Sequence, residues 1–325
     1  PRASAVFSPN ENHHFRASYQ TGFRNPTIGD QYIKLNVGPI IILGGVPVNA
    51  AGMNAYENSY TAASVGAFGG AAGAQLGQGV PLPTAIANNK DKLVQSNVPY
   101  IKAEKVKSFE LGYKGLLSSK LLFDLNYYYS QYTDFIINTV VIRTASNVTL
   151  PDGSINPAAA GDILGGKTQA FQLYTNAADQ VSIQGISGGL SYSLPKNYRL
   201  NANTTWTAFN LGNANASNIP PFNTPTWKTN LTFGNPKLTD KLGFNVAWHW
   251  QSGFDWYGTF TENRPGRINA YSLLDAQLSY KLPSLKTVVK VGASNLTNTY
   301  IMQAYGSPAV GGLYYVSLNF DELLR

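Results

Sequence analysis

Apolar and polar residues alternate along many segments of the chain. Between residues 121 and 129, Phe123 and Leu125 share one parity with other apolar residues. Asp124 and Asn126 occupy the intervening positions. Successive side chains of a β-strand point to opposite faces, so this period of two predicts a strand with one apolar and one polar face.

The same alternation predicts about twelve strands along the chain. They span residues 3–8, 13–20, 105–114, 121–129, 171–176, 181–194, 199–209, 226–233, 242–251, 272–282, 287–294 and 313–320. Many of these segments approach ten residues, whereas strands of soluble sheets usually have about five or six. A tilted strand needs about nine to eleven residues to cross a bilayer. The lengths therefore favour a membrane protein built from strands.

The connections between these segments fall into two length classes. The short ones are 8–13, 115–120, 176–180, 194–198, 234–241 and 282–286, and the long ones are 21–104, 138–170, 210–225, 252–270 and 295–312. Bacterial outer-membrane barrels have short periplasmic turns and long extracellular loops. The pattern predicts an all-β fold, a transmembrane antiparallel β-barrel, in which residues 21–104 form a long extracellular loop.

That first loop is rich in Gly and Ala over Ala62–Gly79. It has two interpretations: a surface loop or poorly ordered segment, or a lid that contacts ligand over the barrel mouth. Several aromatic residues near strand ends are candidates for the interfacial girdle of a barrel, with ordinary packing as the alternative. They are Trp206, Phe209, Trp227, Trp250, Trp256 and Tyr257.

Composition narrows the class further. Charged residues make up 13% of the 325 residues, about half the usual fraction in globular proteins. No run of eighteen apolar residues occurs, which excludes transmembrane helices. The net charge is +7, but Lys and Arg never cluster beyond pairs such as Lys105 and Lys107. We therefore expect no nucleic-acid partner.

The chain offers little for catalysis or metal binding. It has no cysteine and three histidines, His13, His14 and His249. His13 and His14 would point to opposite faces of one strand, so they cannot bind a metal together. No GxSxG or GxxxxGK[ST] motif occurs, so we expect neither a hydrolase elbow nor a phosphate cradle. The sequence predicts no catalytic residue, no metal site and no cofactor.

Several motifs together resemble the TonB-dependent receptor family. FRASYQTGFRNPT at 15–27 is similar to its "GFRaPt" segment, and AEKVKSFELGYKG at 103–115 to its "pEks.s.ElGyk" strand. NAADQVSIQGISGGLSYSL, NTPTWKTNL, VGASNLTNTYI and GGLYYVSLNF resemble later strands of the family in the same order. Two departures are Ser187, where the family commonly has Glu, and the residues DELLR after Phe320.

The resemblance implies that residues 1–325 form the C-terminal portion of a barrel of about 22 strands with a plug inside its lumen. No signal peptide begins at Pro1, so we expect the sequence to start within a longer protein. Half a barrel in a bilayer would leave unpaired edges. The plug and the N-terminal barrel half are therefore expected outside these residues, in the same or a separate chain.

The resemblance also implies roles for individual residues. Glu110 is predicted on the polar face, where it would contact a plug Arg or Lys, with a solvated channel carboxylate as the alternative. Arg16 is predicted to contact the plug as well, with a solvated side chain as the alternative. Arg24, Tyr32 and Tyr56 are predicted to bind ligand, with solvated or packing roles as the alternatives.

The function implied is active import of a nutrient ligand across the cell outer membrane, powered through TonB acting on the plug, without enzymatic chemistry. The ligand classes are siderophore, glycan, peptide and cobalamin, and specificity resides in loops and plug rather than in the fold. Outer-membrane lipid is a partner, and a surface lipoprotein is a further candidate partner. The alternative is a self-contained twelve-stranded outer-membrane barrel that acts as a passive pore or hydrolase.

Overall fold

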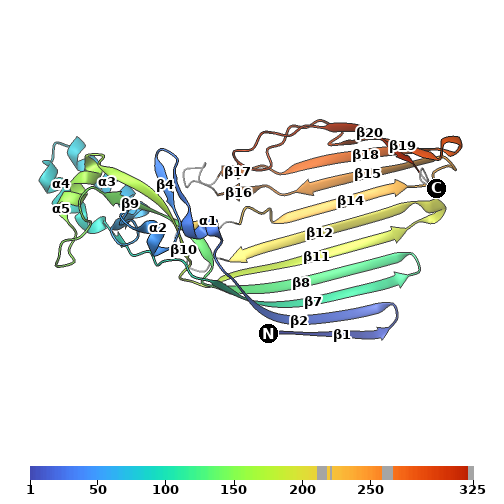
Figure 1. The fold of residues 1–325 in the computed structure, drawn as a ribbon, viewed down its shortest axis with the longest axis horizontal. Helices are drawn as coiled ribbons and strands as arrows, with labels where there is room; N and C mark the ends of the chain where they lie inside the picture. The colour runs from blue at the N-terminus through green and yellow to red at the C-terminus, as the bar shows by residue number, and fades with distance from the viewer. Residues whose placement is uncertain (211–217, 220–221, 258–265, 321–325) are drawn as a thin grey trace.

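A large antiparallel sheet dominates the computed structural model, which describes residues 1–210, 218–219, 222–257 and 266–320. Its eleven strands follow one another in chain order across the sheet (Figure 1). They are β1 (Arg2–Asn10), β2 (His13–Arg24), β7 (Glu104–Ser118), β8 (Leu121–Thr133), β11 (Val181–Ser193), β12 (Arg199–Asn210), β14 (Trp227–Asn235), β15 (Leu242–Gln251), β18 (Tyr271–Leu282), β19 (Thr287–Ser294) and β20 (Leu313–Phe320).

Short and long connections lie at opposite ends of this sheet, as predicted. The turn end joins β1 to β2, β7 to β8, β11 to β12, β14 to β15 and β18 to β19, with the 3-10 turns η2 (Pro195–Asn197) and η4 (Pro283–Leu285) in two of these links. The loop end carries all the longer connections (Figure 1). Each neighbouring pair of strands is antiparallel, so the chain forms an up-and-down meander.

One of the twelve predicted strands is not part of this sheet. The segment 171–176 lies in β10 (Thr168–Asn176), which pairs with β9 (Ile136–Thr144) at the loop end. Residues 176–180 therefore do not form a turn at the turn end. The segment is a strand, as predicted, but its assignment to the barrel was wrong, because the alternation of β10 alone does not indicate which sheet it joins.

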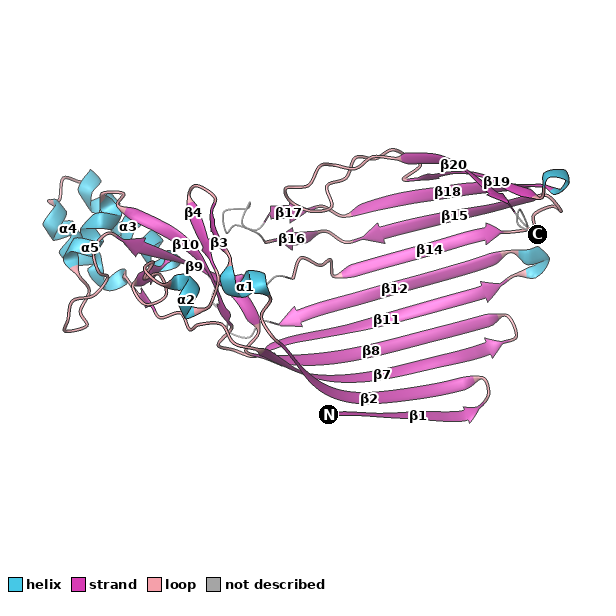
Figure 2. Ribbon diagram, in the orientation of Figure 1, coloured by secondary structure: helices cyan, strands magenta, loops and turns pink. Residues whose placement is uncertain are grey.

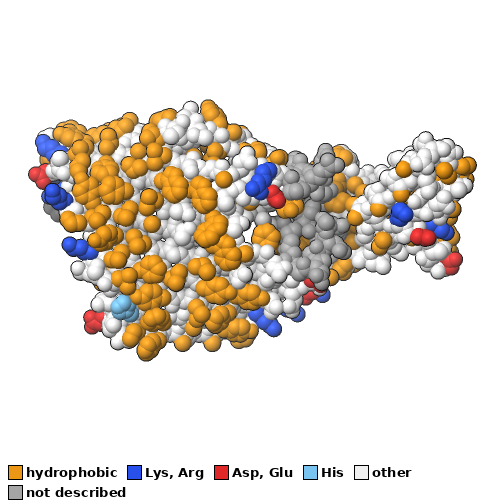
Figure 3. Space-filling view, turned by 180° about the vertical axis from the view of Figure 1, so that it is seen from behind, with side chains coloured by type: hydrophobic (Ala, Val, Ile, Leu, Met, Phe, Trp, Pro, Cys, Tyr) orange, Lys and Arg blue, Asp and Glu red, His pale blue; other side chains and the backbone are white. Residues whose placement is uncertain are grey.

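The strand register gives the large sheet one apolar and one polar face. On β18, β19 and β20, Leu278, Val291 and Val316 stand in one row. They expose 58%, 53% and 70% of their surface. Figure 3 shows hydrophobic side chains spread over this sheet, with charged side chains mainly near its two ends. A contiguous exposed apolar surface of this size marks contact with a membrane or a partner protein.

The long connections fold into a separate unit at the loop end, here called the loop domain (residues 25–103 and 134–180). Its sheet contains β3 (Lys34–Asn36), β4 (Ile40–Leu43), β10, β9, β5 (Ser59–Thr61) and β6 (Gln95–Ser96), and β13 (Asn218–Ile219) pairs with β9. Its helices are α1 (Ile28–Tyr32), α2 (Pro47–Ala50), α3 (Ala62–Gly77), α4 (Leu82–Asn89), η1 (Lys90–Lys92) and α5 (Pro157–Leu164) (Figure 2). A small hairpin of β16 (Phe254–Trp256) and β17 (Gly266–Ile268) connects β15 to β18 at the loop end (Figure 1).

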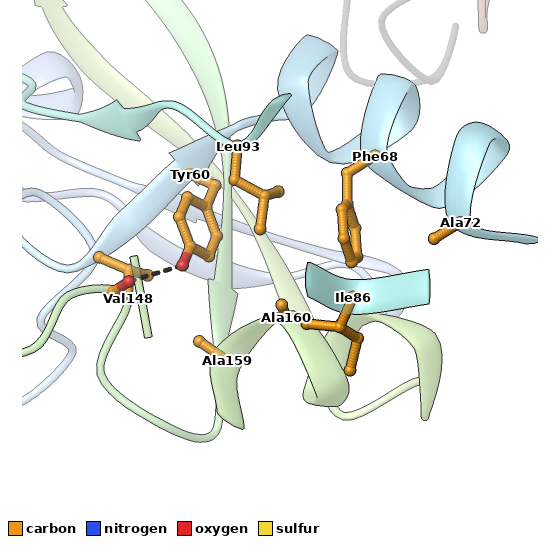
Figure 4. Packing of buried hydrophobic residues seen from close by; sticks show 8 residues of the cluster. All are labelled: Tyr60, Phe68, Ala72, Ile86, Leu93, Val148, Ala159 and Ala160. Atoms are coloured by element: carbon orange, nitrogen blue, oxygen red, sulfur yellow. Dashed lines mark hydrogen bonds between the residues drawn. The ribbon is translucent and has the colours of Figure 1, made fainter. Parts of the chain in front are cut away.

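The Gly- and Ala-rich segment is helical rather than poorly ordered. Thr61 caps α3 by accepting a hydrogen bond from the Ser64 backbone N–H. Phe68 and Ala72 of α3 are fully buried against α4 and α5 in a cluster with Tyr60 (Figure 4). Glycine disfavours helix by about 1 kcal/mol per residue, so this tertiary packing explains why α3 forms. No helix among the described residues has both the length and the hydropathy needed to cross a membrane.

The tyrosines of the loop domain are anchored by hydrogen bonds. The Tyr60 hydroxyl donates to the Val148 carbonyl at 2.6 Å (Figure 4), and burial raises the pKa of Tyr60 to about 12. The Tyr56 hydroxyl donates to the Tyr174 carbonyl at 2.8 Å. The largest fully buried side chains lie mostly in this domain. The loop domain thus holds the packed core of the chain, whereas the large sheet exposes its apolar side chains.

Candidate functional site

A chain of polar groups crosses β12, β14, β15 and β18 on the polar face of the large sheet and ends at Asn295, the residue after β19. Asn230 donates to Asn203 at 2.8 Å. His249 Nδ1 lies 2.6 Å from Asn230 Oδ1, and His249 Nε2 lies 3.3 Å from Asp275. Asp275 in turn accepts from the Asn295 backbone N–H at 2.8 Å. Polar groups that satisfy one another in this way are suited to line a water-filled or protein-filled interior.

A second polar group lies across β2, β7 and β8. Arg16 approaches Asp124 at 3.7 Å and donates to Asn126 at 3.3 Å. Its side chain lies over Gly112, where an added Cβ would come within 2.2 Å of Arg16 Nε. Glycine at 112 therefore makes room for Arg16 to lie flat on the polar face.

Glu110 lies on the same face, as predicted. It stands opposite Ser18 on β2 and Tyr128 on β8. Unlike Arg16, Glu110 has no hydrogen bond or salt bridge within the described part of the chain. A half-buried carboxylate in that condition can accept a donor from a partner.

At the loop end, the large sheet and the loop domain are joined through Glu104. Arg24 donates to both carboxylate oxygens of Glu104, at 2.8 and 3.0 Å. The Ile136 backbone N–H donates to Glu104 Oε2 at 3.2 Å. Only 8% of the Glu104 side chain is exposed, against 50% of Arg24. This arrangement, the rim clamp, ties β2, β7 and β9 together where the chain leaves the sheet.

A sheet with one apolar face, one polar face and its long connections at one end is the wall of a membrane barrel. The family model described as "TonB dependent receptor-like, beta-barrel" matches residues 1–298. The chain belongs to the TonB-dependent receptor family. The resemblance read from the motifs is confirmed, and the large sheet is part of a receptor barrel.

Solved structures agree with the family. The siderophore receptor PirA from Acinetobacter baumannii has 16% identity and a TM-score of 0.55, and the alignment covers 98% of this chain and 40% of that one. The copper transporter OprC has 12% identity and a TM-score of 0.59, with 98% and 39% covered. The FrpB iron transporter from Neisseria meningitidis has 11% identity and a TM-score of 0.57, with 98% and 38% covered. No curated protein matches the chain.

These similarities show the barrel fold, and the chain spans about 40% of the length of PirA. The predicted all-β antiparallel barrel wall is therefore confirmed, with eleven strands in the large sheet rather than about twelve.

The receptor barrel places the predicted ligand residues in different surroundings. Tyr32 ends α1 and is 53% exposed. Tyr56 is 1% exposed and packs among Leu43 and Phe171 in the loop domain. Burial raises the pKa of Tyr56. Arg24 is held in the rim clamp. The structure does not bring these three side chains together, and Tyr56 serves the core of the loop domain.

The predicted girdle residues divide into two groups. Trp227 and Trp250 lie on the apolar face at the loop ends of β14 and β15, whereas Trp206 lies on the same face opposite Ile186, further from the loop end of its strand. Phe209 has the opposite parity and stacks on Phe222. Trp256 lies in β16, beyond the end of β15, and Tyr257 follows it. A girdle role is therefore compatible with Trp227 and Trp250.

The histidines lie as the parity argument predicts. His13 stands opposite Gly115 and His14 opposite Lys114, on different faces of β2. The Ser8 hydroxyl lies 2.7 Å from His14 Nδ1, a contact that sequence reasoning missed. No acidic side chain orients His14 within the described ranges, so the pair lacks the third member of a catalytic triad. The described residues also contain no group of three His, Asp or Glu side chains that could hold a metal ion.

Proposed function

We propose that the complete protein is an active transporter of the outer membrane that imports a nutrient ligand with energy delivered through TonB. The observation that carries this proposal is the separation of the two faces of the barrel wall. Apolar side chains such as Leu278 and Val316 cover one face, and polar contacts such as Asn230 to His249 cover the other. Membership of the TonB-dependent receptor family supports the same function.

The transport route would run along the polar face. A plug inserted beside this face would be held by polar contacts that can break and reform as the inner-membrane machinery pulls on it. Glu110 suits such a contact because it lies on the polar face and forms no hydrogen bond or salt bridge with the residues that the structure describes. Arg16 is half exposed and only loosely paired, at 3.7 Å from Asp124, so it can also turn toward a plug.

The ligand would be captured at the loop end, by the loop domain and the plug together. Siderophore, glycan, peptide and cobalamin are the candidate classes. Siderophores come first in the test because PirA is a siderophore receptor. Tyr32 offers an exposed aromatic surface at the loop end, and a surface lipoprotein could cover the same region.

Uptake in a deletion strain tests the proposal. The wild-type protein should restore uptake of one ligand class, and an uncoupler of the proton gradient should abolish it. Restored uptake that survives the uncoupler would indicate the passive pore instead. No restored uptake of any of the four classes would contradict the transporter.

The Glu110→Ala variant tests the plug contact in the same assay. The variant loses one charge-assisted hydrogen bond, worth about 1.5 kcal/mol, so its rate of uptake should differ from that of the wild type by about tenfold. The control is Asp240→Ala, because the Asp240 side chain is 95% exposed at the turn end. Both variants should insert normally into the membrane. Wild-type uptake by Glu110→Ala would remove Glu110 from the mechanism.

A further inference from the structure

Two lysines lie on the apolar face of the barrel wall, whereas the other charged side chains of its strands lie on the polar face. Glu110, Lys114, Asp124 and Lys228, like the other Asp, Glu, Lys and Arg residues of the eleven strands, lie on the polar face by register. Lys105 and Lys107 are the exceptions. They share the parity of Phe109, Leu111 and Tyr113 on β7, which places them on the apolar face.

Both lysines lie where the apolar face ends. The row containing Phe109 pairs with Tyr19 and Tyr129 and is aromatic. One step toward the loop end, Lys107 stands between Thr21 and Gln131. The next step places Lys105 between Phe23 and Thr133. The face thus changes from aromatic to basic within two rows, with Phe23 still standing beside Lys105.

The lysines have no acidic partner of their own. Both side chains are exposed, and neither forms a salt bridge with any described residue. Gln131 beside them is held by Gln180, to which it donates at 2.7 Å. Residues two apart on a strand are separated by about 7 Å, so the two ammonium groups can reach a single anion. Without an anion they repel each other.

The depth of the two lysines in the membrane indicates which kind of anion they would bind. On the proposed function, the loop end faces the exterior, and the row above the apolar band lies at the lipid head groups. Lysine stems can lie along apolar surface while their ammonium groups reach that level. An anion at the level of the head groups, beside a hydrocarbon surface, belongs to a lipid. The charged group of that lipid is a phosphate.

We propose that Lys105 and Lys107, with Thr21 and Gln131 beside them, form an outward-facing site for the phosphate of a phosphorylated glycolipid in the outer leaflet. The site lies on the opposite face from the transport route. The bound phosphate would hold its lipid against β2, β7 and β8, directly below the rim clamp.

Lipid binding to the purified full-length protein, measured by native mass spectrometry in detergent, tests this site. The probes are bisphosphorylated lipid A, its dephosphorylated form, phosphatidylglycerol and inorganic phosphate. Each lysine near an anionic lipid contributes about 1 kcal/mol, so K105Q/K107Q should bind bisphosphorylated lipid A about 30-fold more weakly. The matched control is K114Q/K281Q, which removes two lysines from the polar face and should bind within about twofold of wild type.

Three results would overturn the site. They are equal binding by K105Q/K107Q and wild type, equal binding of the dephosphorylated lipid, and binding of phosphatidylglycerol or inorganic phosphate as tight as that of lipid A. Uptake by the same variants separates this proposal from the transport function. A wild-type protein that binds lipid A through the lysines but imports no ligand would contradict only the transport function.

Discussion

Glu104→Ala is expected to lower the free energy of unfolding by about 2 to 3 kcal/mol. Removing one member of a buried ion pair costs about 3 to 5 kcal/mol, and the half-exposed position of Arg24 reduces this because water can solvate the freed guanidinium. The Ile136 backbone N–H also loses its acceptor. Urea unfolding of the protein refolded in lipid vesicles measures the change.

The Lys102–Asp134 pair provides the matched control. It lies at the same end of the sheet at 2.8 Å, but the Lys102 side chain is 64% exposed. Lys102→Ala should change the free energy by less than about 1 kcal/mol, as is usual for exposed pairs. A Glu104→Ala variant no less stable than Lys102→Ala would show that the rim clamp contributes nothing.

Ile186→Arg should have the second large effect, a loss of about 2 to 4 kcal/mol, which is the cost of a cation at the middle of the lipid-facing surface of a barrel. Ile186 lies in the middle of β11 and is 43% exposed on the apolar face, between Tyr127 and Trp206. The same urea titration in vesicles measures the loss.

The neighbouring residue supplies the control, because Ser187 points to the polar face opposite Asn126 and Thr205. Ser187→Arg should cost less than about 1 kcal/mol, since water solvates charges on the interior face. Equal losses at positions 186 and 187 would mean that the two faces have the same surroundings.

The faces of the barrel strands could be predicted from the sequence because the period of two is a local property. The short link between β7 and β8 also allowed that hairpin to be predicted from the sequence. The register between β2 and β7 could not be predicted, because the excursion over residues 25–103 separates them and no turn fixes their alignment. The pairing of Arg24 with Glu104 was therefore missed, although both residues lie in the family motifs.

The loop domain escaped prediction for a different reason. Its structure depends on packing between segments far apart in sequence, such as α3 and α5, which contribute Phe68 and Ala160 to one buried cluster. The glycines of α3 disfavour a helix locally. The helix therefore depends on this tertiary packing and could not be predicted from the local sequence. For the same reason Tyr56 was predicted at a ligand surface, whereas its side chain fills the core. The strand 171–176 was assigned to the barrel because its parallel pairing with β4 has no local signal.

Fluorescence quenching of single labelled cysteines tests most directly which face of the wall meets lipid. This chain has no cysteine, so Leu278→Cys and Gln277→Cys each add one defined site to it on neighbouring positions of β18. A quencher carried on lipid chains should act on the label at 278 and an aqueous quencher on the label at 277. Lipid quenching at 277, or protection of 278 from the lipid quencher, would contradict a barrel wall with its apolar face in the membrane.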